Sequence, residues 1–179
     1  AIESNKLSIS TSVPLVDPAG DILGCDGQPL TSYAGFSVAL YEPDASGLDL
    51  GALVPLTTPS AAEAIPPNTS NENPFSLQPD EGRYNFLFDP ARTLSSGLSQ
   101  TDEGAIYILV INPPDDSTFS ERRVLIEVLA PVRNTSNDVV ALRYEATSLD
   151  GQPISVDGET NLTRTVQVDD AEQQSLTFF

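Results

Sequence analysis

At its centre the chain reads Ile106-Tyr107-Ile108-Leu109-Val110-Ile111, an unbroken apolar run that follows Glu103-Gly104 and stops at Asn112-Pro113-Pro114. A continuous apolar run of this length between turn residues is typical of a strand that is covered on both faces. We therefore predict that residues 106–111 form the central strand of a sheet.

Several other segments alternate apolar and polar residues, which is the pattern of a half-buried strand. The segments are Leu7–Val16, Phe36–Tyr41, Tyr84–Phe88, Arg123–Leu129, Val139–Thr147, Thr163–Val168 and Ser175–Phe179. The first should be an edge strand, because Pro14 cannot donate to a ladder. No segment carries an amphipathic helical pattern of useful length. The sequence therefore predicts an all-β fold, an antiparallel β-sandwich.

One long connection interrupts this pattern between Asp44 and Asp80, where proline, serine, threonine and asparagine dominate. Its prolines are too closely spaced for a helix or a central strand. We expect a single long Pro/Ser/Asn-rich loop on the surface. It is either a solvated connection without a role or a recognition loop on a rigid β frame.

The charge balance excludes some partners. The chain carries 26 acidic and 8 basic residues, for a formal net charge of −18. Nucleic acids require a basic stripe that displaces counterions, and anionic membrane surfaces attract basic segments. We therefore predict no nucleic-acid partner and no direct membrane contact.

The sequence contains no histidine and a single cysteine, Cys25. Ser-His-Asp and Cys-His catalysis and a typical zinc site are therefore excluded. Paired acids such as Asp115-Asp116 lie side by side in polar segments, whereas a glycosidase holds two acids across a cleft. We predict that the protein is not an enzyme and that Cys25 is a small core or turn residue.

Several phrases occur in a recognisable order: Asp26-Gly27-Gln28-Pro29-Leu30, a strand ending in Leu40-Tyr41, Glu81-Gly82-Arg83-Tyr84-Asn85-Phe86, and the central run with Pro113-Pro114. This series resembles the prealbumin-like surface modules of bacteria. The nearest types are the B-type repeats of serine-aspartate-repeat adhesins, the collagen-adhesin B-type modules and the carboxypeptidase-regulatory-like domains. The resemblance implies that the β-sandwich is of immunoglobulin-like or prealbumin-like type. It also implies an extracellular or cell-surface location and neighbouring modules of the same protein as partners.

The resemblance covers about residues 7–119 of the chain. We expect one β-sandwich domain over 1–179, in which 1–119 form the prealbumin-like core. Residues 120–179 supply additional strands, which either complete the same sandwich or begin another.

Serine-aspartate-repeat B modules bind calcium through acidic loops, so the resemblance implies either calcium or no cofactor. The nearest candidates for metal ligands are Asp17, Asp21 and Asp26. Calcium takes six to eight oxygen ligands, and these three acids are more widely spaced than in a complete calcium loop. A solvated acidic rim is the alternative.

Collagen-adhesin B-type modules often contain a Lys-Asn isopeptide bond promoted by a buried acid. Lys6 stands just ahead of the first predicted strand, where that lysine should be. The acid would fall near Phe88, which cannot serve. Asp89 or Glu127 could substitute, with Asn161 as the acceptor.

We expect a non-enzymatic spacer or adhesion unit of a larger bacterial protein, with an extracellular protein or a glycan as a further partner. A carbohydrate-binding module is the alternative. A subunit that lends or accepts a strand is a third, suggested by the apolar tail Leu176–Phe179, which would be costly to leave exposed.

Overall fold

The fold was analysed in a computed structural model, which describes residues 18–47, 49–169 and 176–179. Every regular element in these ranges is a β-strand, as predicted. No helix in the described part of the chain is long and apolar enough to cross a membrane. The predicted strand Leu7–Val16 lies entirely outside the described residues, so it stays a prediction.

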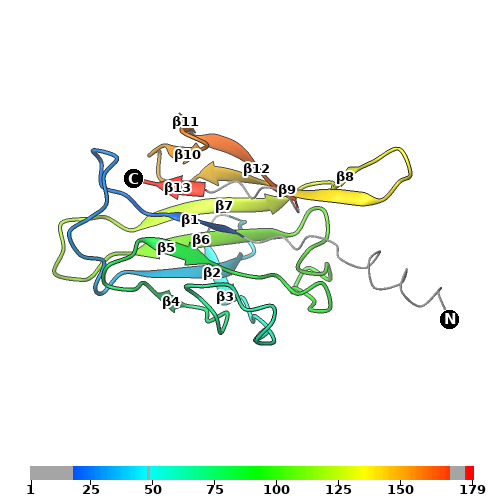
Figure 1. Cartoon of the computed structure of the whole chain (residues 1–179), viewed down its shortest axis with the longest axis horizontal. Helices are drawn as coiled ribbons and strands as arrows, with labels where there is room; N and C mark the ends of the chain where they lie inside the picture. The colour runs from blue at the N-terminus through cyan, green and yellow to red at the C-terminus, as the bar shows by residue number, and fades with distance from the viewer. Residues whose placement is uncertain (1–17, 48, 170–175) are drawn as a thin grey trace.

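The larger sheet has eight antiparallel strands in the described part of the chain, in the order β12-β9-β7-β6-β2-β3 (Figure 1). These are six of the eight strands, and the other two are β4, which also pairs with β2, and β8, which pairs with β9. The bounds are β2 (Ser37–Pro43), β3 (Leu50–Leu53), β4 (Phe75–Ser76), β6 (Ile106–Asn112), β7 (Arg122–Val128), β8 (Val132–Arg133), β9 (Val139–Ser148) and β12 (Thr163–Asp169).

Strand β6 lies inside this sheet and is buried on both faces, as the apolar run predicts. Ile108 and Leu109 point to opposite faces, and both are fully buried. On one side β6 pairs with β2, with Val38 opposite Ile111, and on the other with β7, with Leu109 opposite Val124. Strands on either side of residue 119 therefore share one sheet.

A second layer of short strands covers one face of the larger sheet (Figure 1). It contains β1 (Ala19–Asp21), β5 (Arg83–Asn85), β10 (Ile154–Val156), β11 (Glu159–Asn161) and β13 (Leu176–Phe178). β1 pairs with β5, β13 pairs with β10, and a parallel bridge between Ile22 and Phe178 joins the two groups. The core is packed between the layers, which makes the fold a β-sandwich.

The apolar tail is part of this second layer. Leu176 and Phe178 are fully buried, and Tyr84 Oη donates to Leu176 O at 2.9 Å. Gly20 passes so close that an added Cβ would lie 1.8 Å from Leu176 O. The tail is therefore covered by its own chain, and strand exchange with a partner stays a prediction.

Residues 44–80 differ from the solvated excursion that their composition suggests. They include the edge strands β3 and β4, and buried asparagines tie the rest to the frame. Asn68 Nδ2 donates to Asn85 O at 2.9 Å, and Asn85 Nδ2 donates to Ile65 O at 3.0 Å. The two amides thus join the segment to β5.

Two further asparagines continue these contacts. Asn71 Nδ2 donates to Thr57 O and Leu87 O, and its Oδ1 accepts from Leu87 N. Asn73 Oδ1 accepts from Leu40 N, and its Nδ2 donates to Leu40 O at 2.9 Å, as a neighbouring strand would. Because amides replace missing ladder bonds, the segment is held against the sheet.

Candidate functional site

A pocket of about 430 Å³ opens at one end of the sandwich, where strands of both layers begin or end. Its walls come from the end of β6, the start of β7, the residues that flank β1 and β2, and the end of β13. The apolar wall residues are Ile22, Leu23, Leu30, Phe36, Ile111, Phe119, Phe178 and Phe179. Cys25 is an exposed turn residue that also lines the pocket.

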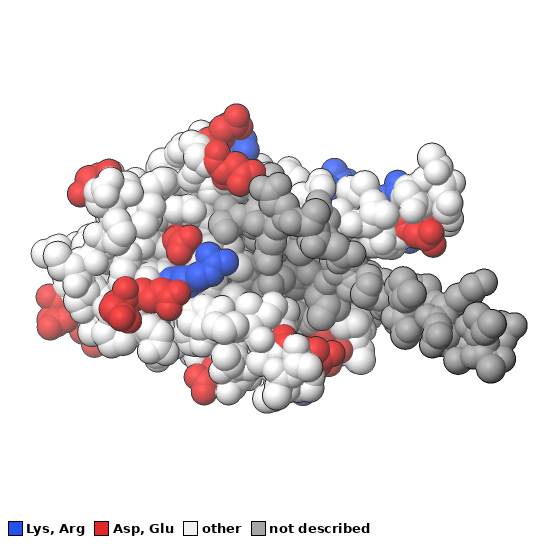
Figure 2. All heavy atoms as spheres, viewed as in Figure 1, with Lys and Arg blue, Asp and Glu red and all other residues white. Residues whose placement is uncertain are grey.

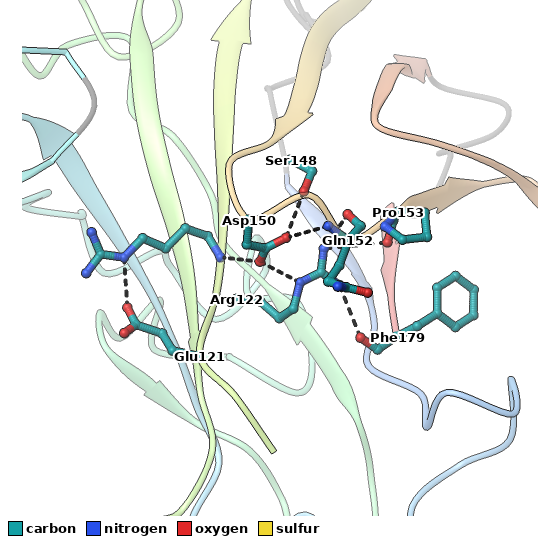
Figure 3. Close-up of polar contacts among 8 residues, drawn as sticks. Glu121, Arg122, Ser148, Asp150, Gln152, Pro153 and Phe179 are labelled. Atoms are coloured by element: carbon teal, nitrogen blue, oxygen red, sulfur yellow. Dashed lines mark hydrogen bonds and ion pairs between the residues drawn. The ribbon is translucent and has the colours of Figure 1, made fainter. Parts of the chain in front are cut away.

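Arg122, the first residue of β7, lines this pocket and is 7% exposed. Figure 3 shows its polar contacts. Its Nε donates to Asp150 Oδ2 at 2.7 Å, Nη1 to Phe179 O at 3.1 Å and Nη2 to Gln152 O at 2.9 Å. The guanidinium carbon also lies 5.8 Å from the centre of the Phe178 ring. One side chain therefore ties three segments together.

Asp150 receives bonds from four groups. Besides Arg122 Nε, they are Arg123 N at 3.1 Å, Ser148 Oγ at 2.8 Å and Gln152 N at 3.0 Å. Burial raises the pKa of the Asp150 carboxyl, but these hydrogen bonds, led by that from Arg122, outweigh burial and hold the pKa below its usual value. Asp150 is therefore ionised at neutral pH.

Sequence reasoning missed the pairing of Arg122 with Asp150. The neighbouring Arg123 contacts a carboxylate close in sequence, with its Nε 2.9 Å from Glu121 Oε1. Alternate residues along β7 are buried, and Arg122 takes one of these buried positions together with Val124, Ile126 and Val128. This alternation is the signal that could have shown that Arg122 points inward. An arginine at an inward position needs a carboxylate partner.

Phe119 stands at the mouth of the pocket. It is 46% exposed, and its ring centre lies 5.9 Å from that of Phe36, which is buried. The segment that carries Phe119 joins β6 to β7 and passes close to the turn at Gly35, where an added Cβ would meet Pro114 at 2.8 Å. An aromatic side chain thus remains accessible beside an open apolar cavity.

The two Asp-Gly-Gln-Pro phrases both border this pocket. In the first turn Asp26 Oδ1 accepts from Gln28 N at 3.0 Å, and in the second Asp150 Oδ1 accepts from Gln152 N at 3.0 Å. Gly27 and Gly151 have φ angles of 77° and 76°. The repeated phrase therefore encodes the same aspartate cap and the same positive-φ glycine twice.

The residues proposed as metal ligands are not all placed together. Asp17 lies outside the described residues. Asp21 Oδ2 lies 3.5 Å from Arg83 Nη1, and Asp26 caps its own turn. Among the described residues, no group of three or more acidic or cysteine side chains could hold a metal ion. Calcium binding stays a prediction.

The residues proposed for the isopeptide bond are also dispersed. Lys6 is outside the described residues. Phe88 is buried and stacks on Tyr107, with ring centres 4.3 Å apart. Asp89 instead accepts a hydrogen bond from Thr57 at 2.6 Å, and Asn161 is exposed. The crosslink stays a prediction without a described geometry.

No family model, curated protein or solved structure matches this chain. The resemblance to prealbumin-like modules therefore rests on the sequence phrases alone. The site itself is an apolar pocket whose wall contains a hydrogen-bonded arginine and two carboxylates, Glu121 and Asp150.

Proposed function

We propose that this chain is a non-enzymatic β-sandwich module of a bacterial extracellular or cell-surface protein, acting as a structural spacer or adhesion unit. One observation carries the proposal: the buried amide and charged side chains of the described residues are bonded to the frame itself. They are Glu42, Asn68, Asn71, Asn85, Gln100 and Arg122.

These bonds serve architecture. Glu42 accepts from Ser95 N at 2.7 Å, and Gln100 bridges Asp89 N and Pro55 O. Burial raises the pKa of Tyr107 well above its usual value, so its hydroxyl stays neutral and donates to Gln100 O. A catalytic group must instead be positioned toward a substrate, so this arrangement favours a rigid frame over an enzyme.

The carbohydrate-binding alternative has less support. Sugar-binding platforms use exposed aromatic rings, and Tyr33, Tyr84, Tyr107 and Tyr144 are buried, while Tyr41 is half-buried. The exposed aromatic side chain at the pocket is Phe119.

Hydrogen-exchange mass spectrometry tests the rigid frame. We expect amides of residues 54–73 that bond to the frame to exchange with the slow strands of the larger sheet, because opening them breaks the asparagine contacts. Exchange of this segment at the rate of an unfolded chain would contradict a rigid module.

A binding and turnover assay tests the role. Beads coated with the module are exposed to immobilised extracellular proteins and to a glycan array, and the soluble module is incubated with chromogenic esters, glycosides and peptides. Retention on a protein surface supports adhesion, and no retention together with slow exchange supports a spacer. Turnover of any substrate would contradict the proposal.

A further inference from the structure

The end pocket combines a cavity with an exposed ring. Its volume of about 430 Å³ falls in the range of ligand sites, roughly 300–1,000 Å³. Phe119 leaves nearly half of its surface in solvent at the mouth. A partner that covered this ring and filled the cavity would gain from burying apolar surface.

The charged groups in the wall are already paired. Arg122 is bonded to Asp150 at 2.7 Å, and Glu121 is bonded to Arg123 at 2.9 Å. A charged group entering the cavity would lose water without gaining a free counter-charge from these residues. The part of a ligand that enters the pocket should therefore be uncharged and apolar.

The rim has the opposite preference. Three segments supply lining residues of the pocket, 24–30, 112–123 and 149–153, and together they carry five acids and two arginines. Glu121 and Asp150 are paired with Arg123 and Arg122. The surplus of three negative charges therefore comes from Asp26, Asp115 and Asp116, which belong to these segments but do not line the pocket itself. Figure 2 shows acidic side chains at this end of the visible face, which lies on the left of the view.

We propose that the end pocket is a docking site for an extended cationic peptide segment of a partner protein, which inserts one bulky apolar side chain. Aromatic anchors of this kind dominate binding energy at protein interfaces, and the acidic rim attracts basic residues on either side of the anchor. The proposal specifies the partner for the adhesion role above and rests on that role.

A second copy of the chain fits this surface poorly. Each copy has a net charge of −18, so two copies repel each other at long range. The charge of the rim favours a partner of opposite sign.

Tryptophan fluorescence offers a direct test, because the chain contains no tryptophan. The probe is the peptide acetyl-Lys-Gly-Trp-Gly-Lys-amide, compared with peptides in which the lysines are replaced by glutamates or the tryptophan by alanine. We expect a saturable blue shift of emission for the lysine peptide that weakens with added salt, since the charge attraction is screened.

Binding can be located through Cys25, the single cysteine of the chain. Because Cys25 lines the pocket, bound lysine peptide should slow its alkylation by iodoacetamide. The alanine peptide, followed by the same alkylation assay, should give little protection.

Matched variants separate the anchor from the charge. Phe119→Ala should weaken binding of the lysine peptide about tenfold, as expected for loss of a contact at the centre of an interface. Leu162→Ala should not, although Leu162 is similarly exposed at 48%. Asp116→Asn should weaken binding about two- to fivefold, and Asp138→Asn, an exposed acid on the β8–β9 connection, should not.

Thermal unfolding first confirms that all four variants are folded. The proposal is overturned if the lysine peptide shows no saturation up to about 1 mM, if the glutamate peptide binds as well, or if both members of a matched pair behave alike. Glycan-array binding that is lost in Phe119→Ala would assign the pocket to a carbohydrate instead. If the peptide fails while the bead assay still shows retention on a protein, the pocket proposal falls and the adhesion proposal stands.

Discussion

The two Asp-Gly-Gln-Pro turns share a hydrogen bond from glutamine to aspartate and a glycine at positive φ, and they differ in what else their aspartates bind. Each aspartate accepts a bond of 3.0 Å from the glutamine amide two residues later, and each glycine has a φ angle near 77° (77° and 76°). Local sequence therefore specifies the turn in both places.

Tertiary position makes the second turn far more consequential. Asp150 also bonds Arg122, Arg123 N and Ser148, whereas among the described residues the Asp26 carboxylate accepts from Gln28 N alone. The same four residues therefore form a turn closed by its own backbone at 26, where Gly24 N donates to Gln28 O at 2.8 Å, and a clamp between distant segments at 150.

The largest effect should come from removing Arg122. Arg122→Ala should lower the free energy of unfolding by about 3 kcal/mol, because it leaves Asp150 and two carbonyl groups without their partner. Urea unfolding measures the change. The control is Arg123→Ala, which removes a more exposed pair and should cost up to about 1 kcal/mol. Equal losses of unfolding free energy in the two variants would contradict a clamp formed by Arg122 and Asp150.

Replacing Asp150 should also destabilise the fold more than replacing Asp26. Asp150→Ala should cost about 2–3 kcal/mol, because a buried guanidinium loses its counter-charge, while Asp26→Ala should cost about 0.5–1 kcal/mol for one exposed bond. Asp150→Asn should fall between them, since an amide oxygen can still accept from Gln152 N. Chemical unfolding of the three variants decides the order, and a larger loss at Asp26 would reverse the comparison.

Acid should remove the contribution of Asp150. Its folded pKa lies below the usual value of 3.8, so the unfolded chain binds this proton more readily than the folded chain does. The carboxylate therefore stabilises the fold above its unfolded pKa, and this contribution is lost as the pH falls through its folded pKa.

The stability of the wild-type chain and of Asp150→Asn should accordingly converge in acid. Urea unfolding of both proteins between neutral pH and about pH 2 measures the difference. A gap that stays constant over this range would show that the charge of Asp150 does not contribute.

The smallest effect should be common to both turns. Gly27→Ala and Gly151→Ala should each cost about 1 kcal/mol, because an L-residue is strained at positive φ. Neither glycine has a neighbour within 4 Å of an added Cβ, so no clash adds to the strain. Thermal or urea unfolding should give the same loss for both, and a marked difference would mean that the two backbones are not equivalent.

The strands of the larger sheet could be predicted because their residues alternate or form an unbroken apolar run. The ranges predicted around Phe36–Tyr41 and Ile106–Ile111 match β2 and β6 closely. β1 and β10 were missed, since a strand of three residues has no measurable period. Pairing with distant partners, such as Ile154 with Phe178, defines these short strands.

The asparagine contacts and the pocket could not be predicted for a different reason. An asparagine in a Pro/Ser-rich segment has the composition of a solvated loop, and its buried partner, such as Leu87 O for Asn71, lies elsewhere in the chain. The pocket likewise joins segments as distant as Ile22 and Phe178. The two sequence signals for the pocket are the position of Arg122 among the inward-facing residues of β7 and the repeated Asp-Gly-Gln-Pro phrase.

Amide hydrogen exchange at Gln28 and Gln152 tests the comparison of the two turns most directly. Both amides donate to the aspartate two residues before them, and the backbone bonds that close the first turn join only residues 24–28. Local bonds alone would therefore protect Gln28 at least as well as Gln152. We predict much slower exchange at Gln152, because opening its turn also breaks the bonds between Asp150 and Arg122. Equal exchange at the two amides would contradict the claim that the second turn clamps this end of the sandwich.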